Sequence, residues 1–318
     1  MSWKLCDDYK EIEVRKVYGK TLEELIKKDK KVVVADADLA GSSGAGYLFD
    51  KYKDNCVNFG IAEQNMISAC SAMSLTGIIP YVHSFSPFVS RRVVDQIAVS
   101  LGFSKSNLHI YASEPGYWSL FNGATHTTFC DIAIMRAIPG MTVVAPSDAV
   151  SFKWVLEYYY QNKGAFYNRC TRKAIPQIYE TDSTFEYGKS QVLKKGKDVA
   201  LISIGASVYD CLEARKELLK FGIDCTVIDL LFIKPLDKEL ILNTIRENRL
   251  IVTVENHSKY GGIGELIGGE IAKSVYHTDL KMIAVDDIYG EVGTKDYLKE
   301  RFGLTKEVII NTVKKYFA

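Results

Sequence analysis

One glutamate in the first half of this 318-residue chain lies where a carboxylate could do chemistry. Glu63 falls in the first turn of a helix predicted over Ile61–Leu75, which is built largely from small and apolar residues. Such a helix is expected to be buried. A buried carboxylate is costly unless it is paired or has a shifted proton affinity, so Glu63 is a candidate acid–base residue. The alternative is that Glu63 only complements the helix dipole.

Two further loops carry side chains that could complete a site around this carboxylate. Phe85 and Phe88 follow the next predicted strand, and His126 follows the strand after that. A carboxylate facing an aromatic slot, with a histidine nearby, suits a flat heteroaromatic cofactor whose ring nitrogen is protonated or hydrogen bonded. Taken singly, each aromatic is more often a core residue and His126 more often a structural histidine.

The elements that must position these residues alternate along the chain. The predicted strands are 31–36, 57–59, 77–83, 108–112, 141–145 and 165–169, and the predicted helices are 11–28, 61–75, 91–102, 131–138 and one that runs to Tyr160 from a cap at Ser147 or Asp148. This alternation predicts a parallel, doubly wound sheet, whose ligands bind beyond the carboxyl ends of the strands. The Gly- and Ser-rich run 37–44 and the segment 113–125 are predicted to be irregular.

A second, smaller α/β domain is predicted after a linker within residues 171–197, where the periodicity is lost. Its predicted strands are 198–205, 222–229, 250–255 and 280–285, and its predicted helices are 207–221, 261–274 and 306–317. We place the two doubly wound domains at residues 1–180 and 186–318. Each is large enough to bury its own core.

Composition excludes several classes of partner. Lys plus Arg number 40 and Asp plus Glu 39, so no net field favours nucleic acid or an anionic membrane. No stretch reaches the roughly 20 apolar residues of a membrane span, and no apolar signal segment stands at the N-terminus. The seven cysteines form no CxxC pair, which is typical of reduced thiols in a cytoplasmic protein.

Six short motifs carry a family resemblance. They are Gly60–Met66, Ser84–Phe85 with Phe88, Asp95–Ile97, Gly123–His126, Met135–Pro139 and Val144–Asp148. Together they resemble the pyrimidine-binding half of transketolase, and Val254–His257 followed by Gly261–Gly264 is similar to that family's C-terminal domain. The resemblance covers nearly the whole chain and implies a pyrimidine-binding-type parallel sheet followed by a smaller transketolase C-terminal-type domain.

The resemblance implies a role for each residue near the cofactor, thiamine diphosphate. Glu63 would hydrogen bond the aminopyrimidine ring nitrogen and so promote the imino tautomer that generates the nucleophile. Phe88 would stack on the pyrimidine and Phe85 would wall the same pocket. Asp38 and Leu39 match the family's Asp-Leu pair beside the cofactor.

It also implies substrate-binding residues. His126 matches the histidine that contacts donor hydroxyl and carbonyl oxygens. Arg15, Ser42 and Arg172 fall where the family grips the anionic tail of a sugar phosphate, a task that suits the arginine fork.

Two substrate positions depart from the family pattern. Asn122 stands where the family has an aspartate, and Glu114 lies near the place of a family histidine. Changes of this kind alter which hydroxyls or carbonyls fit. We therefore expect ketol transfer on an unusual ketose, whose tail could carry an anion other than phosphate.

The chain contains no segment that resembles the family's magnesium- and diphosphate-binding motif. It therefore resembles the C-terminal subunit of a split transketolase, active only with an N-terminal subunit that holds the diphosphate and Mg²⁺. The family suggests two copies of each subunit, an α2β2 assembly. No residue of this chain is expected to bind metal.

Three other functions remain open. A 2-oxo acid dehydrogenase β subunit and a 1-deoxyxylulose 5-phosphate synthase-like enzyme would use the same cofactor. The Gly123–His126 motif and the trio Arg15, Ser42 and Arg172 favour transketolase. A non-catalytic assembly or regulatory subunit is the third alternative, and the retained Glu63 argues against it.

Overall fold

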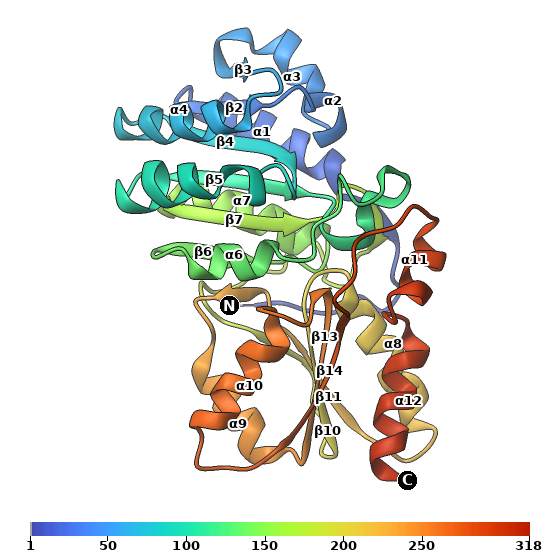
Figure 1. The fold of residues 1–318 in the computed structure, drawn as a ribbon. Helices are drawn as coiled ribbons and strands as arrows, with labels where there is room; N and C mark the ends of the chain where they lie inside the picture. The colour runs from blue at the N-terminus through green and yellow to red at the C-terminus, as the bar shows by residue number, and fades with distance from the viewer. Residues whose placement is uncertain (1) are drawn as a thin grey trace.

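The computed structural model describes residues 2–318, and its first half is built on a seven-stranded sheet (Figure 1). The strand order is β12-β6-β7-β5-β4-β2-β3, and all neighbours are parallel except β12. The bounds are β2 Val32–Asp36, β3 Cys56–Asn58, β4 Ile79–Phe85, β5 Leu108–Ser113, β6 Met141–Val144, β7 Ala165–Cys170 and β12 Phe232–Lys234. The central strands are buried throughout, as expected of strands covered on both faces.

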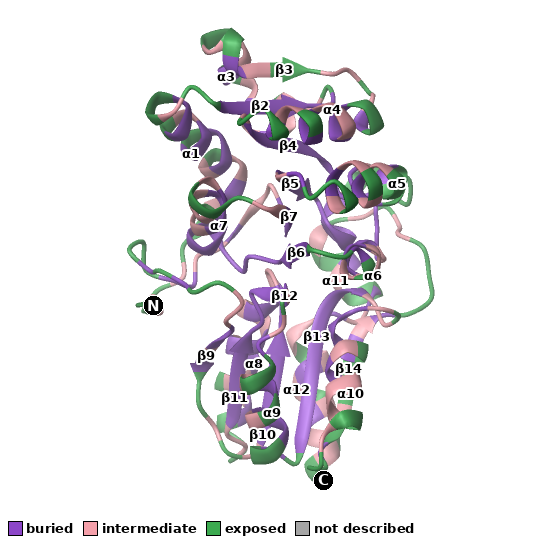
Figure 2. Ribbon diagram, turned by 90° about the vertical axis from the view of Figure 1, so that its left-hand side faces the viewer, coloured by how far each residue is buried: buried purple, intermediate pink, exposed green. Residues whose placement is uncertain are grey.

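Helices cover both faces of this sheet (Figure 2). On one face, α1 (Val14–Lys28) packs against α7 (Ala149–Asn162). On the other lie α4 (Glu63–Leu75), α6 (Asp131–Ala137) and a helical segment of 3₁₀ (η2, Arg91–Val93), α (α5, Val94–Gln96) and π character (η3, Ile97–Phe103). The predicted doubly wound fold is confirmed.

The second half forms a five-stranded sheet of order β14-β13-β10-β11-β9, parallel except for β9. Its strands are β9 Gln191–Lys194, β10 Val199–Ser203, β11 Cys225–Asp229, β13 Leu250–Ser258 and β14 Asp279–Val285. One side is covered by α8 (Ser207–Leu219) and α12 (Lys306–Phe317), the other by α9 (Lys238–Glu247) and α10 (Ile263–Lys273). Helix α11 (Lys295–Arg301) contacts the first half at η4 (Gly116–Asn122).

Several local predictions were wrong. The run 37–44 is not wholly irregular, because it contains the short helix α2 (Ala40–Ser43), which α3 (Gly46–Lys51) follows. The predicted helix 11–28 begins instead with a strand, β1 (Glu11–Glu13), paired with β8 (Ala174–Pro176) inside the expected linker. Segment 113–125 contains η4. Such short pieces depend on contacts with distant segments.

Helix α4 is not buried all round, which corrects the expectation drawn from its composition. Its outer face leaves Leu75 exposed, and the π-helical segment η3 beside it leaves Val99 and Phe103 exposed. Small and apolar residues therefore continue onto a surface that the rest of residues 2–318 does not cover. Within residues 2–318, no helix is long and apolar enough to cross a bilayer.

Candidate active site

The carboxyl ends of β2, β4 and β5 are tied together by a buried polar chain. Asp36 Oδ2 lies 2.8 Å from His83 Nδ1, and His83 Nε2 lies 2.9 Å from Ser113 Oγ. The other oxygen of Asp36 accepts a hydrogen bond from the backbone N–H of Leu39. Each strand contributes one member of the chain, so the loops that leave these strands start from fixed positions.

Glu63 stands beside this edge as the first residue of α4, with only 2% of its surface exposed. Its Oε1 accepts a hydrogen bond from Ser84 Oγ at 3.2 Å, and its Oε2 accepts one from Arg92 Nη1 at 2.6 Å. The buried carboxylate is therefore paired. The helix N-terminus adds a favourable dipole, so the ion pair and the dipole both stabilise the buried charge.

Arg92 was missed by the sequence analysis. It lies in η2, four residues after Phe88, and its guanidinium carbon is 4.1 Å from the Phe88 ring centroid. The spacing of an arginine after an aromatic was the available signal. It was weak, because exposed arginines are usually solvated.

The predicted aromatic residues and the predicted histidine lie together. The ring centroids are 6.1 Å apart for Phe85 and Phe88, 5.9 Å for Phe85 and His126, and 5.2 Å for Phe88 and His126. Phe85 is buried and the other two are half-buried. His126 Nδ1 lies 2.8 Å from Thr125 Oγ1, which orients the ring. The three rings form a wall, and Arg92 links it to Glu63 by lying over Phe88 while donating to the carboxylate.

Asp38 and Leu39 follow β2 at the same edge. Asp38 has a positive φ of 64°, which Asp tolerates better than most residues. Its backbone N–H donates to Asn58 Oδ1 at 3.1 Å, and its carboxylate accepts from Asn58 Nδ2 at 3.2 Å. Asn58 ends β3, so the strand next to β2 fixes the conformation of this loop.

Glu114 lies directly after β5 and is 1% exposed. Its Oε1 accepts from Arg172 Nε at 2.6 Å and its Oε2 from Thr171 Oγ1 at 2.8 Å, while Lys173 Nζ is 3.9 Å away. Burial raises the pKa of the Glu114 carboxyl, and the Arg172 charge opposes that rise. The guanidinium of Arg172 also lies 5.3 Å from the Phe85 ring centroid. Glu114 and Arg172, both predicted at the substrate, thus bind each other.

Arg15 and Ser42 are the other residues predicted to bind the tail, and the backbone of Arg15 contacts both Arg172 and the Ser42 loop. The N–H of Arg15 donates to Arg172 O at 3.3 Å. Ser42 lies in α2, and a Cβ on the neighbouring Gly44 would stand 2.3 Å from Arg15 O, so only glycine allows this approach. The side chain of Arg15 is turned to Glu13, with Nε 2.6 Å from Oε1.

Asn122 ends η4 and is exposed. The segment that leads to Asn122 begins at Pro115, and Asn256 in the second half of the chain forms hydrogen bonds with its backbone. Asn256 Nδ2 donates to Pro115 O at 3.1 Å, and Asn256 Oδ1 accepts from Tyr117 N at 3.2 Å. Between them Gly116 has a φ of +60°, and a Cβ there would lie 2.1 Å from Asn256 Oδ1.

Comparison with known families now accounts for this arrangement. Residues 10–177 match the model for the transketolase pyrimidine binding domain, and residues 188–309 match that for the transketolase C-terminal domain. The chain belongs to the transketolase family. It is 35% identical over 297 residues to the "6-deoxy-6-sulfo-D-fructose transketolase subunit SqwH" of Clostridium sp. (strain MSTE9), a match that covers 93% of this chain and 92% of that protein.

Two further members of the transketolase family resemble it over nearly their full length. A "putative transketolase C-terminal section" from Methanocaldococcus jannaschii is 37% identical over 302 residues, 94% of this chain and 95% of that protein. A solved structure described as "split gene transketolase, inactive beta4 tetramer" superposes with a TM-score of 0.87 at 33% identity, covering 96% of this chain and 98% of that one. The predicted resemblance to a transketolase subunit is confirmed.

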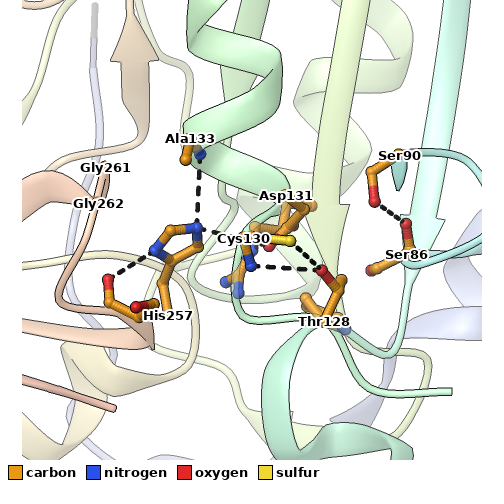
Figure 3. Close-up of polar contacts among 12 residues, drawn as sticks. Ser86, Ser90, Thr128, Cys130, Asp131, Ala133, His257, Gly261 and Gly262 are labelled. Atoms are coloured by element: carbon orange, nitrogen blue, oxygen red, sulfur yellow. Dashed lines mark hydrogen bonds and ion pairs between the residues drawn. The ribbon is translucent and has the colours of Figure 1, made fainter. Parts of the chain in front are cut away.

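The two transketolase domains meet at a buried polar cluster around His257 and Asp131 (Figure 3). His257 Nδ1 donates to Ser258 O at 2.8 Å, and its Nε2 accepts from the N–H of Ala133 at 3.5 Å. These bonds require a neutral imidazole, and burial accordingly lowers the pKa of His257 to about 4. Arg169 Nε binds Asp131 Oδ2 at 2.7 Å nearby. The cluster joins β7 and α6 to β13, so it holds the two domains in register.

Proposed function

We propose that the chain is the pyrimidine-binding subunit of a thiamine diphosphate-dependent transketolase. It would move a two-carbon ketol unit from an anionic-tailed ketose to an aldose acceptor. The observation that carries the proposal is the buried, paired Glu63 beside the ring wall of Phe85, Phe88 and His126. When bound, thiamine diphosphate supplies the nucleophilic carbon that carries the two-carbon unit.

The residues present fit the pyrimidine ring of that cofactor. A planar group, the guanidinium of Arg92, already lies against Phe88 and donates to Glu63. In the proposed complex Glu63 hydrogen bonds the ring nitrogen, Phe88 stacks on the ring and Phe85 closes the pocket. Asp38 and Leu39 line its edge, on the loop fixed by Asn58.

We assign donor binding to His126 and Asn122, and tail binding to Arg15, Ser42 and Arg172. Both arginines are already paired with a carboxylate of this chain, Arg15 with Glu13 and Arg172 with Glu114. Each carboxylate cancels one of the positive charges around it, which include Lys16 at 3.0 Å from Glu13 and Lys173 at 3.9 Å from Glu114, so the positive charge left for a tail is reduced. A phosphate carries a charge of about −1.5 to −2 near neutral pH, whereas a sulfonate carries a single charge. We infer that Glu114 favours a monoanionic tail such as a sulfonate, the class of substrate named for the Clostridium relative.

The proposal assigns the diphosphate and Mg²⁺ to a partner, the N-terminal transketolase subunit, in an α2β2 assembly in the cytoplasm. The exposed apolar residues Leu75, Val99 and Phe103 support an assembled state, because contiguous apolar surface usually marks a protein interface. Ile61, two residues before Glu63, is exposed as well.

The test is reconstitution. The chain is co-purified with the product of the adjacent gene, thiamine diphosphate and Mg²⁺ are added, and ketose donors are screened by aldehyde release. We expect release from a sulfonate-tailed ketose only when both subunits are present. Carbon dioxide release from pyruvate would instead indicate a 2-oxo acid dehydrogenase or a 1-deoxyxylulose 5-phosphate synthase-like enzyme. Full activity of a Glu63→Ala complex would support a non-catalytic subunit. If the complex used the pair xylulose 5-phosphate and ribose 5-phosphate as efficiently as any other donor and acceptor, the inferred tail would be wrong.

A further inference from the structure

Arg92 makes, within this chain, the two contacts that the proposed function assigns to a pyrimidine ring. Its Nη1 donates to Glu63 Oε2 at 2.6 Å, and its guanidinium lies over Phe88 with 4.1 Å between the guanidinium carbon and the ring centroid. A guanidinium and an aminopyrimidine whose ring nitrogen carries a proton both present a planar N–H that can donate to a carboxylate, and both have a flat face that can lie on an aromatic ring.

We propose that Arg92 is a stand-in for the cofactor's pyrimidine ring. In the chain without its partner, Arg92 occupies the pyrimidine position, and its side chain swings away when the cofactor enters. The proposal rests on the proposed function, because it takes the ligand of Glu63 and Phe88 from there.

The backbone of Arg92 is fixed, while its side chain is free to move. Gln64 Nε2 donates to Arg92 O at 3.1 Å, and the next residue, Val93, is fully buried with its N–H bound to Ser90 O. Ser90 is itself held by a hydrogen bond from its hydroxyl to Ser86 O (Figure 3). The side chain of Arg92, in contrast, is 41% exposed. Side-chain rotation alone can carry the guanidinium into solvent.

The contact solves a problem that Glu63 creates. If both the cofactor and Arg92 were absent, the deeply buried Glu63 carboxylate would keep only the 3.2 Å hydrogen bond from Ser84 Oγ. An unpaired buried charge is strongly destabilising, so the site would tend to collapse. Arg92 supplies the missing charge and keeps the carboxylate and Phe88 apart at the spacing of one planar group.

The stand-in must also be easy to displace. The Arg92 side chain is 41% exposed, so it can pass into water when a ring makes the same two contacts with Glu63 and Phe88 in its place. The apparent dissociation constant then exceeds the intrinsic one by the reciprocal of the fraction of molecules with Arg92 swung away. Removing the guanidinium should therefore tighten cofactor binding by about threefold to tenfold.

The first test measures the Kd of thiamine diphosphate by calorimetry, with Mg²⁺ saturating, for the complex with the N-terminal subunit. Arg92→Met keeps a flexible stem on Phe88 but removes the charge. Arg91→Met is the matched control, because Arg91 lies on the neighbouring groove with Thr127 and Asp286. We expect tighter binding by Arg92→Met and wild-type binding by Arg91→Met. Equal or weaker binding by Arg92→Met overturns the stand-in alone. Failure of the wild-type complex to bind overturns the proposed function as well.

The second test needs no cofactor. Urea unfolding of the partner-free chain is compared for wild type, Glu63→Gln, Arg92→Met and the double variant. We expect the double variant to lose less stability than the two single losses together, because each single change breaks the same pair. Strictly additive losses would show that Arg92 does not hold Glu63 in solution, and would overturn the proposal.

Discussion

Glu63 and Glu114 lie at the same sheet edge and make the same kinds of contact. Glu63 and Glu114 are both almost fully buried, and each accepts one hydrogen bond from an arginine, Arg92 or Arg172, at 2.6 Å. Each also accepts one hydroxyl hydrogen bond, and each arginine lies over a phenylalanine ring. Geometry alone would give the two pairs the same function.

Exposure and surrounding charge distinguish them. The side chain of Arg92 is 41% exposed, whereas that of Arg172 is 17% exposed and has Lys173 beside the same carboxylate. The Glu63 pair can open toward solvent, but the Glu114 pair is enclosed. We propose that the first is an exchangeable contact at the cofactor position and that the second is a permanent pair that sets the charge at the substrate's tail.

The largest expected effect comes from Glu63→Gln. The amide keeps the shape of the side chain but cannot act as an acid–base partner for a ring nitrogen, so kcat of the assembled complex should fall by at least about 100-fold. Steady-state aldehyde release measures it, with the exposed Asn65→Ala as control. A loss of less than tenfold, on the order of 1.4 kcal/mol, would remove Glu63 from the chemistry.

Gly116→Ala should disturb the residues around Glu114 and leave the residues around Glu63 unchanged. The new Cβ would stand 2.1 Å from Asn256 Oδ1 at a φ of +60°, so we expect a stability loss of roughly 2–4 kcal/mol and a raised KM for the donor. Cofactor affinity should be unchanged.

Gly140→Ala is the matched control for that change. Gly140 has a φ of +75°, but a Cβ there would meet no described atom within 4 Å. Urea unfolding should show only the strain of a left-handed alanine, about 1–2 kcal/mol. Equal losses for the two variants would mean that the Asn256 contact does not hold the loop.

Asp229 shows what a buried carboxylate does without an arginine. Its Oδ2 accepts from Ser147 Oγ at 2.7 Å and from Tyr179 OH at 2.8 Å, and burial raises its pKa to about 7. The folded chain therefore binds more protons than the unfolded chain between about pH 4 and about pH 7. The stability that this carboxyl contributes is present below about pH 4 and is lost as the pH rises through about 7.

Asp229→Asn should therefore gain stability relative to wild type as the pH rises from about 4 to about 7. Urea unfolding of both chains across that range measures the difference, with the exposed Glu180→Gln as control. A difference that stays constant with pH would show that Asp229 is ionised throughout.

The smallest expected effect is a change of specificity in Glu114→Gln. Loss of one negative charge beside Arg172 should raise kcat/KM for a phosphate-tailed ketose relative to a sulfonate-tailed one, by about tenfold. Glu13→Gln, at the partner of Arg15, should act in the same direction but less strongly, since Glu13 is more exposed. An unchanged ratio would show that Glu114 does not set the tail preference.

The sequence predicted the elements better than the contacts between them. The alternation of strands and helices placed Glu63, Phe85, Phe88 and His126 at one edge, because each follows a predicted strand and parallel strands end at the same edge. The pairing of Arg92 with Glu63 was not predictable, since it depends on a 3₁₀ turn and on the rotamer of an exposed side chain. Glu114 was predicted beside substrate, but its pairing with a residue 58 positions away was not.

Missed elements have similar causes. Strand β12 has three residues and joins the first sheet from the second half of the chain, through the pairing of Phe232 with Val144. No local pattern signals such a pairing. Helix α9 could have been predicted, because Asp237 caps it and Ile241 and Ile245 follow at helical spacing.

The central claim is that this chain holds only half of a cofactor site, and cofactor binding tests it most directly. Thiamine diphosphate with Mg²⁺ is titrated calorimetrically into this chain, into its N-terminal partner and into the two combined, and the last titration is repeated with Glu63→Gln. We predict tight binding only to the combined subunits, and weakened binding when Glu63 is changed. Tight binding by this chain alone, or by a complex indifferent to Glu63→Gln, would contradict the account.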